Sequence, residues 1–247
     1  MNVPSSRTGR RAPWVIAALV IVPLVVLAGI YLLFFTDDSP EELTLSDPPV
    51  TQPGVTPVTG GSSGGFVSTL EGTWNVAQGS VAGYRVKEKL ASLPAQSDAV
   101  GRTESITGTV RLRSNGSRLE AEAVNVEVDV STLKSDEDRR DNRVRGALGT
   151  DQFPKATFTS TGGVVLPDNL AAGDDVTADI AGQLTIHGVT KQVTIPLQFR
   201  VTGGQGEVVG SLTFPFSDFE ISPPNIGGFV SVESDATLEF KMLLTRA

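Results

Sequence analysis

The chain has 247 residues, no cysteine, one histidine and a net charge of −8 at pH 7. Without cysteine it has neither a disulfide framework nor a thiolate nucleophile, and one histidine is too few for a zinc-type site. Basic residues are scattered among acidic ones, which argues against binding to nucleic acid or to an anionic lipid surface. We therefore expect no catalytic residue, no metal and no cofactor, and a binding or structural role rather than an enzyme.

The N-terminal segment predicts a transmembrane helix. Residues 14–35 (WVIAALVIVPLVVLAGIYLLFF) carry no charge, and as a helix they are long enough to cross the roughly 30 Å hydrocarbon core. The segment is longer than a signal-peptide core and no small-residue cleavage site follows it, which favours an uncleaved anchor. Arginines precede the segment and acidic residues follow it, so residues 1–13 are predicted to be cytoplasmic. The sequence thus predicts a single-pass protein of the cell membrane whose bulk is extracytoplasmic.

A linker is predicted over residues 36–70. This stretch mixes Pro, Gly, Ser and Thr with acidic residues and has no apolar period, which is typical of disordered linkers. Its Pro-rich first part should be stiff and its GGSSGG part flexible. The linker would hold the domain formed by residues 71–247 away from the bilayer but free to reorient.

Apolar and polar residues alternate through most of residues 71–247, which predicts one-sided β-strands. The alternation is clearest over residues 176–186, 189–201 and 230–244. Over residues 119–130 the apolar positions change parity at Ala123–Val124, which predicts a β-bulge. Residues 135–149 (SDEDRRDNRVRGALG) instead predict one short helix, because Ser135 and Asp138 match a capping box and Gly149 can end the helix.

About eight antiparallel strands with one apolar face each must bury those faces. One short helix cannot cover them, so the sheet either closes into a barrel or folds into a sandwich. A barrel of about eight strands encloses either packed side chains or one small apolar ligand. Periodicity alone leaves these alternatives open.

The only histidine, His187, lies between two alternating runs. His187–Gly188 has the length of a two-residue hairpin turn, with Gly available for positive φ. A lone histidine in such a turn has no further ligand to complete a metal site. We therefore interpret His187 as a turn residue.

Six motifs are distributed along the domain: TWNV at residues 73–76, GYRVKE at 83–88, RRD at 139–141, FPKATFTST at 153–161, GQLTIHGVTKQV at 182–193 and FSDFEI at 216–221. Together they resemble the motifs of the YceI-like family of bacterial polyisoprenoid-binding proteins. The stretch at residues 182–193 is the most diagnostic of them. The resemblance covers the domain from about Thr73 onward. It implies an all-β fold, a lipocalin-like antiparallel eight-stranded β-barrel with one short helix, and an isoprenoid chain held in an apolar tunnel of an exported protein.

The chain departs from this family at three positions where its members often carry histidine. Gly79, Glu88 and Arg143 stand there instead. Glu88 shares the parity of Tyr84 and Val86, so its carboxylate is on the face expected to be interior, where an unpaired charge is costly. We expect Glu88 to pair with an arginine or to lie near the barrel mouth.

The sequence therefore predicts a membrane-anchored barrel that binds an isoprenoid or quinone-like lipid, with no nucleic acid and no identified protein partner. Burial of the apolar chain would supply the affinity. The residues expected to contact the ligand belong to the apolar strand faces: Tyr84, Val86, Val126, Val128, Phe158, Leu184, Leu197, Phe199, Leu238 and Phe240.

An alternative is a structural or interaction module of the cell envelope whose barrel is filled by its own side chains. Its contact surface would be residues 214–229 (FPFSDFEISPPNIGGF), which gather four Phe among Pro and Gly. A loop at the mouth of a tunnel explains the same composition, so this stretch does not discriminate between the two hypotheses.

Overall fold

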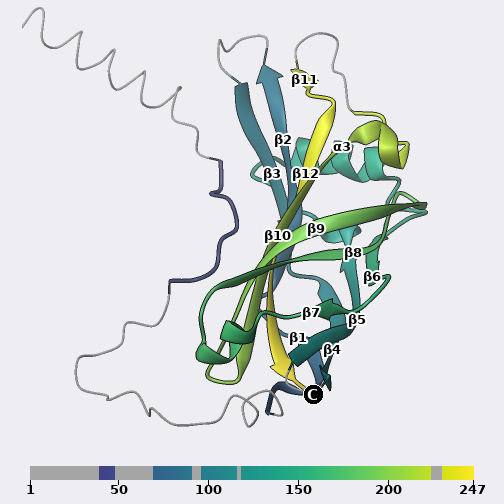
Figure 1. Ribbon diagram of the computed structural model, residues 1–247. Helices are drawn as coiled ribbons and strands as arrows, with labels where there is room; N and C mark the ends of the chain where they lie inside the picture. The colour runs from purple at the N-terminus through teal and green to yellow at the C-terminus, as the bar shows by residue number, and fades with distance from the viewer. Residues whose placement is uncertain (1–38, 48–68, 91–95, 116–117, 224–229) are drawn as a thin grey trace, which may run out of the picture. The chain divides into compact units, whose positions relative to one another are not determined.

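Strands dominate the structure of this protein. A computed structural model describes residues 39–47, 69–90, 96–115, 118–223 and 230–247 (Figure 1). The strands are β1 (Gly72–Val76), β2 (Val81–Leu90), β3 (Gln96–Thr103), β4 (Ile106–Asn115), β5 (Arg118–Asp129), β6 (Lys155–Ser160), β7 (Val164–Val165), β8 (Val176–Ile186), β9 (Val189–Thr202), β10 (Gln205–Pro215), β11 (Val230–Val232) and β12 (Asp235–Arg246). The helical elements are α3 (Asp138–Leu148) and the 3₁₀ turns η1 (Val130–Thr132), η2 (Asp168–Ala172) and η3 (Phe216–Phe219).

The sheet closes on itself, which removes exposed strand edges. Eight strands form the ring in the order β1-β4-β5-β6-β8-β9-β10-β12, and β1 pairs with β12 to close it. Every pairing among the named strands is antiparallel. Closure confirms the barrel implied by the resemblance and excludes the sandwich.

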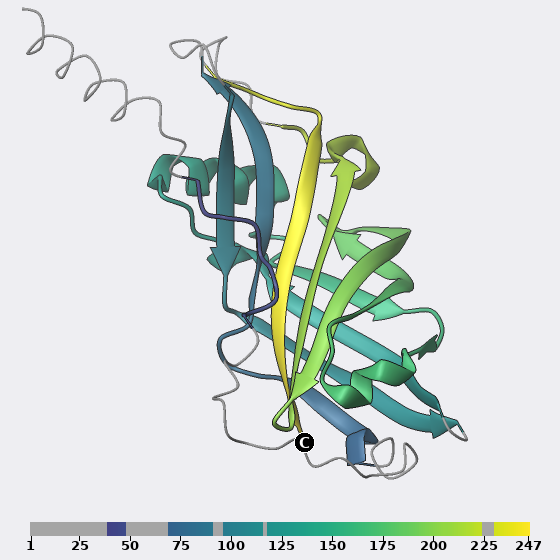
Figure 2. The same cartoon turned by 60° about the vertical axis from the view of Figure 1, so that its left-hand side comes forward.

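The hairpin of β2 and β3 extends the barrel wall toward the end that carries α3 (Figure 2). β12 is shared: residues 237–241 pair with β2, whereas residues 244–246 pair with β1. The barrel therefore has two ends: one is bordered by β2, α3 and η3, and the other lies near the C-terminus of the chain (Figure 1).

The bulge predicted in the long fifth strand is present. Arg111 pairs with Ala123 and Leu112 pairs with Ala121, so Glu122 has no partner across the ladder. The extra residue lies next to the Ala123–Val124 position where the apolar parity changes. It lets Leu119 and Ala121 on one side of the bulge and Val126 on the other all face the interior.

The hairpin turn at His187–Gly188 is also confirmed. Its two residues have φ of 54° and 76°, and β8 and β9 pair in register from Ile186↔Val189 onward. His187 Nδ1 lies 3.1 Å from the carbonyl oxygen of Phe219, and its ring packs edge-on against Phe153. The described residues contain no cluster of three His, Asp or Glu side chains able to hold a metal ion.

The helix prediction was correct in type but wrong at its start. α3 begins at Asp138, and its N-cap is Glu137, whose carboxylate accepts a hydrogen bond from the Arg139 amide. Ser135 donates its amide and hydroxyl to Asp141 Oδ1 instead of capping the helix. Gly149 ends α3 in the left-handed conformation, as predicted.

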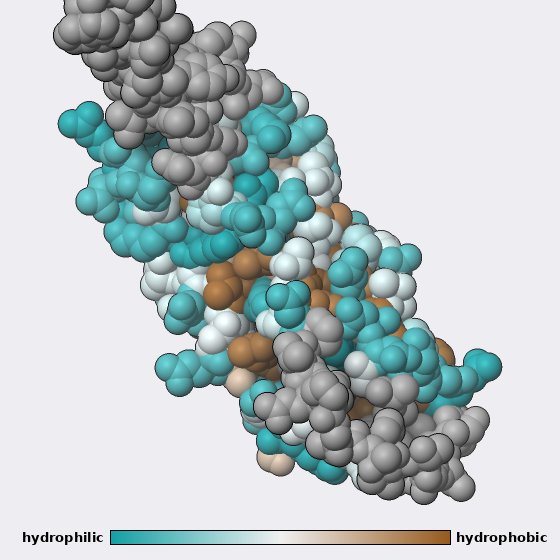
Figure 3. Space-filling view, turned by 90° about the vertical axis from the view of Figure 1, so that its left-hand side faces the viewer, coloured by the Kyte–Doolittle hydropathy of each residue, from teal (hydrophilic) through white to brown (hydrophobic). Residues whose placement is uncertain are grey.

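Inward-facing apolar side chains line the barrel in three clusters, while Figure 3 shows hydrophilic residues over much of one outer face, with hydrophobic residues among them near its middle. One end of the core is built around Trp74, whose indole donates to the Leu70 carbonyl at 2.9 Å. The other end is built around Phe219, which is 1% exposed and meets Phe214 edge-on. Packing therefore already involves Leu70, at the last position of the predicted linker.

The structure describes only part of the N-terminal region in which the transmembrane helix and the linker are predicted. The predicted span, residues 14–35, lies outside the described residues, and no helix among the described residues is long and apolar enough to cross a bilayer. Residues 39–47, which the composition places in the linker, run along the outside of the barrel and are hydrogen-bonded to it. We refer to residues 39–47 as the strap.

Candidate functional site

The barrel interior contains two adjoining cavities. Cavity 1 occupies the end near the C-terminus and has about 1270 Å³ of space free of protein atoms, and cavity 2 occupies the end near α3 and has about 1130 Å³; both volumes include space that is open to solvent. Both are lined by Ala82, Val128, Ala156 and Leu238, so they meet in the middle of the barrel. An extended molecule could therefore lie along both cavities.

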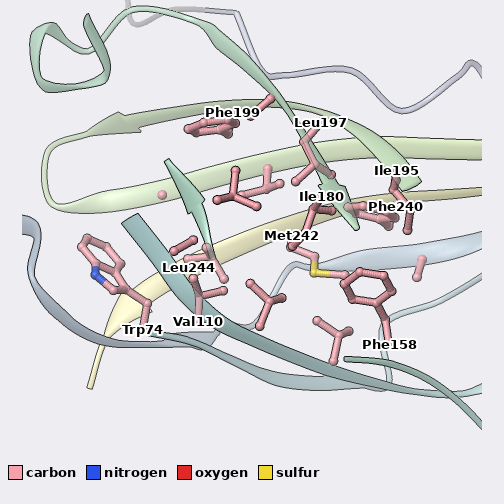
Figure 4. Close-up of a pocket in the computed structure, with 18 of the residues that line it drawn as sticks. Trp74, Val110, Phe158, Ile180, Ile195, Leu197, Phe199, Phe240, Met242 and Leu244 are labelled. Carbon is pink, nitrogen blue, oxygen red and sulfur yellow. The ribbon is translucent and has the colours of Figure 1, made fainter. Parts of the chain in front are cut away.

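Cavity 1 is lined almost wholly by apolar side chains. Phe199 and Leu197 from β9 face Trp74, Val110 and Phe158 across the cavity (Figure 4). The two polar residues in its lining are Thr157 and Arg200. The guanidinium of Arg200 is bound by Asp175 at 2.9 Å and by the strap, which leaves an apolar surface for a ligand.

Cavity 2 has the same apolar character but one polar end. Tyr84 and Glu88 reach it from β2, and Arg140 and Arg143 reach it from α3. Val144, Ala147 and Leu148 of α3 complete the lining on the same side. The helix thus closes this end of the barrel with an apolar face and a small group of charged side chains.

Glu88 pairs with Arg140, as expected from its interior position. Arg140 Nε and Nη2 lie 3.2 Å from Glu88 Oε1 and Oε2 respectively, in a two-point contact. Burial by itself would lower the pKa of Arg140, but the hydrogen bonds and charge of Glu88 raise it. The pair joins α3 to β2 across the polar end of cavity 2.

Tyr84 places a buried hydroxyl close to this pair. Its Oη has no hydrogen-bond partner, and burial raises the pKa of Tyr84, so the phenol stays protonated. The ring lies over Gly101 of β3, where a Cβ would be only 2.4 Å from Tyr84 Cε1. Gly101 is thus the position on the neighbouring strand that leaves room for this ring.

Replacing Glu88 with Gln should loosen α3. The change leaves the Arg140 guanidinium partly buried without its two-point partner, which we expect to cost about 1–3 kcal/mol of unfolding free energy. Hydrogen exchange of the α3 amides should accelerate. The matched control is Glu122→Gln, whose pair with Arg113 is largely exposed and should contribute almost nothing. Equal α3 exchange in Glu88→Gln and the wild type would show that the pair does not hold the helix.

Asp141 stabilises the start of α3 in its ionised form. Burial alone would raise the pKa of Asp141, but hydrogen bonds from Ser135 and the charge of Lys134 lower it below its usual value. Because the pKa is lower in the folded protein, the stabilisation is complete above the unfolded-state pKa of about 3.9 and is lost as the pH falls through the folded value. The free energy of unfolding in urea should therefore decrease below about pH 4. Asp141→Asn should remove the part of this pH dependence that comes from Asp141. An unchanged pH profile in Asp141→Asn would contradict this role.

All ten residues predicted from sequence to contact the ligand line at least one of the two cavities. Cavity 1 receives most of them, and Tyr84 and Val86 line cavity 2. Their contact with a ligand stays a prediction. Sequence reasoning missed part of the wall. Alternation in β4 and β12 could have indicated Val110, Leu112, Met242 and Leu244, whereas Trp74 lies on the short strand β1. It also missed Arg140 and Val144 of α3.

The described aromatic residues of the surface proposed for an interaction module face inward. Phe214 and Phe219 are buried, and Phe216 lines cavity 2. Residues 224–229 lie outside the described residues. This arrangement agrees with a loop at the mouth of a tunnel rather than with an exposed aromatic contact surface.

A closed eight-stranded antiparallel barrel with one helix and an apolar interior defines a lipocalin-like protein. Residues 63–244 match the sequence profile of the YceI-like domain. The chain belongs to the YceI-like family, which confirms the resemblance read from its motifs.

Individual relatives agree with this assignment. The chain is 31% identical over 142 residues to a UPF0312 protein of Vibrio vulnificus, covering 54% of this chain and 70% of the relative. It is 40% identical over 89 residues to Protein YceI of Escherichia coli, covering 35% of this chain and 41% of that protein. A solved polyisoprenoid binding domain from Saccharophagus degradans, implicated in plant cell wall breakdown, superposes with a TM-score of 0.54 at 17% identity, covering 70% of this chain and 98% of that domain. At that identity the structural likeness concerns the fold.

Proposed function

We propose that this protein binds a long apolar lipid of the isoprenoid or quinone-like class along its two cavities. The observation that carries the proposal is the apolar lining of cavity 1, which adjoins cavity 2 and shares four lining residues with it. Burial of a lipid chain contributes about 25 cal/mol per Å² of apolar surface, so affinity needs few polar contacts. The name of the Saccharophagus degradans domain supports the ligand class.

The lipid would lie with its tail in cavity 1 and its polar end in cavity 2. A polar headgroup in cavity 1 would lose its hydration and meet only two polar side chains of the lining, Thr157 and the already paired Arg200, which costs several kcal/mol. In cavity 2 the exposed guanidinium of Arg143 and the Tyr84 hydroxyl can both donate hydrogen bonds. A headgroup with acceptor oxygens therefore fits this end.

The protein would act at a membrane and outside the cytoplasm, with residues 14–35 as its anchor. The support is the charge-free length of that segment and the arginines that precede it. An anchored carrier can exchange an insoluble lipid with the bilayer without releasing it far into water. Fractionation of cells that produce the full chain, with protease added from either side of the membrane, tests this topology.

Native mass spectrometry followed by organic extraction tests lipid binding. The fragment Ser39–Ala247 forms one compact unit and should be purified without detergent from cells that export it. We expect one bound lipid of isoprenoid or quinone mass per chain. A ligand-free mass that persists after incubation with polyprenyl phosphate and ubiquinone would overturn the proposal and favour the filled-barrel interaction module.

A further inference from the structure

The strap is hydrogen-bonded to five neighbouring strands on the outer side of the barrel. Its first residues bind β3 and β2: Ser39 Oγ donates to the Asp98 carbonyl at 2.6 Å, and Arg85 Nη2 donates to the Pro40 carbonyl at 2.7 Å. Its last residues bind β12, β10 and β9. The strap, purple in Figures 1 and 2, therefore connects strands that the backbone ladder joins only in pairs.

Ser46 is the centre of the contact with β12, β10 and β9. Its amide and hydroxyl both donate to Glu207 Oε1 at 2.9 Å, and its carbonyl accepts from Arg200 Nη2 at 2.5 Å. Lys241 Nζ donates to Ser46 Oγ at 2.9 Å and to the Thr44 carbonyl at 3.1 Å. Hydrogen bonds to charged groups are the stronger class, so this end of the strap is firmly docked.

The barrel side chains that bind Ser46 are also paired with one another. Glu207 Oε2 lies 3.4 Å from Arg200 Nη2, and Glu207 Oε1 lies 2.9 Å from Lys241 Nζ. Burial alone would raise the pKa of Glu207, but hydrogen bonds from Lys241 and Ser46 lower it, so the carboxylate stays ionised. The three side chains are therefore oriented before the strap docks, which lowers the entropy cost of docking.

The strap holds, from outside, the wall that encloses cavity 1. Arg200, Glu207 and Lys241 each lie between two residues that line this cavity. Those six lining residues are Phe199, Val201, Gly206, Val208, Phe240 and Met242. Figure 4 shows three of them around the cavity, Phe199, Phe240 and Met242. Because successive side chains of a strand point to opposite faces, an outward residue moves together with its inward neighbours.

This wall has less internal support than an ordinary core. Open space inside the barrel removes part of the close packing that makes protein interiors stiff. In addition, β9 and β10 pair only from Thr202↔Gln205 to Leu197↔Gly210, although both strands continue further. A lipid inside the cavity and the strap outside it restrict the same wall. Two events that restrict the same freedom favour each other, because the second loses less conformational entropy.

We infer that docking of the strap and binding of lipid in cavity 1 are positively coupled: the docked strap raises the affinity for lipid, and bound lipid holds the strap docked. This coupling rests on the proposed function of cavity 1. By linkage the two effects are equal, and couplings between sites typically change affinity by about 5- to 150-fold. The strap precedes the segment that matches the family, residues 63–244, so family membership does not imply the coupling.

Hydrogen exchange tests the effect of lipid on the strap. The full chain is incubated with ubiquinone and, separately, with polyprenyl phosphate, and native mass spectrometry measures the fraction of lipid-bound chains. We expect the amides of the strap peptide that contains Ser46 to exchange at least about 5-fold more slowly in the lipid-bound chain than in the lipid-free chain. This measurement uses the native sequence, so it does not depend on the folding of any variant.

Lipid titration of a strap variant tests the reverse effect. The variant replaces residues 39–47 with a Gly-Ser sequence of the same length, and we expect its dissociation constant for lipid to rise at least about 5-fold. The matched control combines Glu42→Ser with Asp47→Ser, which removes two of the three acidic residues of the strap. Both side chains are exposed and have no hydrogen bond or ion pair with the described residues, so the control should bind lipid as the native chain does.

The outcomes separate the coupling from the proposed function. If the native chain binds lipid but strap exchange does not change, or if the Gly-Ser variant binds lipid as tightly as the native chain, the coupling is overturned and the proposed function stands. A native chain that takes up neither ubiquinone nor polyprenyl phosphate overturns the proposed function and the coupling with it.

Discussion

Ala178→Trp should abolish lipid binding while the barrel stays folded. Ala178 is on β8 and faces cavity 1, where an indole would occupy the space of the lipid tail. A large aromatic side chain buries about 150–250 Å², and excluding that much ligand surface at about 25 cal/mol per Å² raises the dissociation constant at least about 100-fold. The measurement is titration with polyprenyl phosphate or ubiquinone.

The control is Ala181→Trp, the same change three residues along the same strand but on the exposed outer face. It should bind lipid as the wild type does. Thermal unfolding adds a second readout, because a tryptophan entering open space costs little, whereas overpacking of a filled core costs about 1–3 kcal/mol. Tight binding by Ala178→Trp would exclude cavity 1 as the tail site, and a large loss of stability would indicate a barrel filled by its own side chains.

Glu239→Ala should lower the free energy of unfolding by about 3–5 kcal/mol. We expect this loss to exceed that from removing the charge of an exposed ion pair. The Glu239 side chain is only 4% exposed. Its Oε1 accepts from Arg102 Nε at 2.9 Å and Nη2 at 2.7 Å, and its Oε2 lies 3.4 Å from Arg85 Nε. Without the carboxylate, two neighbouring guanidiniums lose their common partner, and such a change is far more costly than loss of an exposed pair. Urea unfolding measures the effect.

Glu127→Ala provides the comparison. Glu127 also pairs across strands, with Lys155 at 2.6 Å, but both side chains are roughly half exposed. Its loss should cost less than about 1 kcal/mol. Glu239→Ala should also make the strap more susceptible to protease, because Arg85 and Arg102 hold its Pro40 and Glu41 carbonyls. Similar losses of unfolding free energy in Glu239→Ala and Glu127→Ala would contradict the expectation that a buried ion pair costs more to break than an exposed one.

The cavity wall could be predicted from sequence largely because β-strand faces alternate with every residue. Val126 and Val128 on β5, and Leu238 and Phe240 on β12, fall on the inner face by parity alone. Trp74 was missed because β1 is too short to show an alternating pattern. The side chains of α3 were missed because a helix with many charges gives no sign of which face will cover a cavity.

What the sequence by itself determined was local: the strand faces, the bulge beside Ala123, the hairpin at His187–Gly188 and the end of α3 at Gly149. Each depends on residues a few positions apart, whose side-chain direction and backbone freedom follow from their type and order. Local patterns did not decide between a barrel and a sandwich: the family resemblance implied the barrel, and the tertiary structure showed that eight strands close around open space. The tertiary structure also brought Arg140 to Glu88 and Ser46 to Glu207, which are 52 and 161 residues apart. Contacts of that separation depend on the register and closure of the whole sheet, which no local pattern encodes.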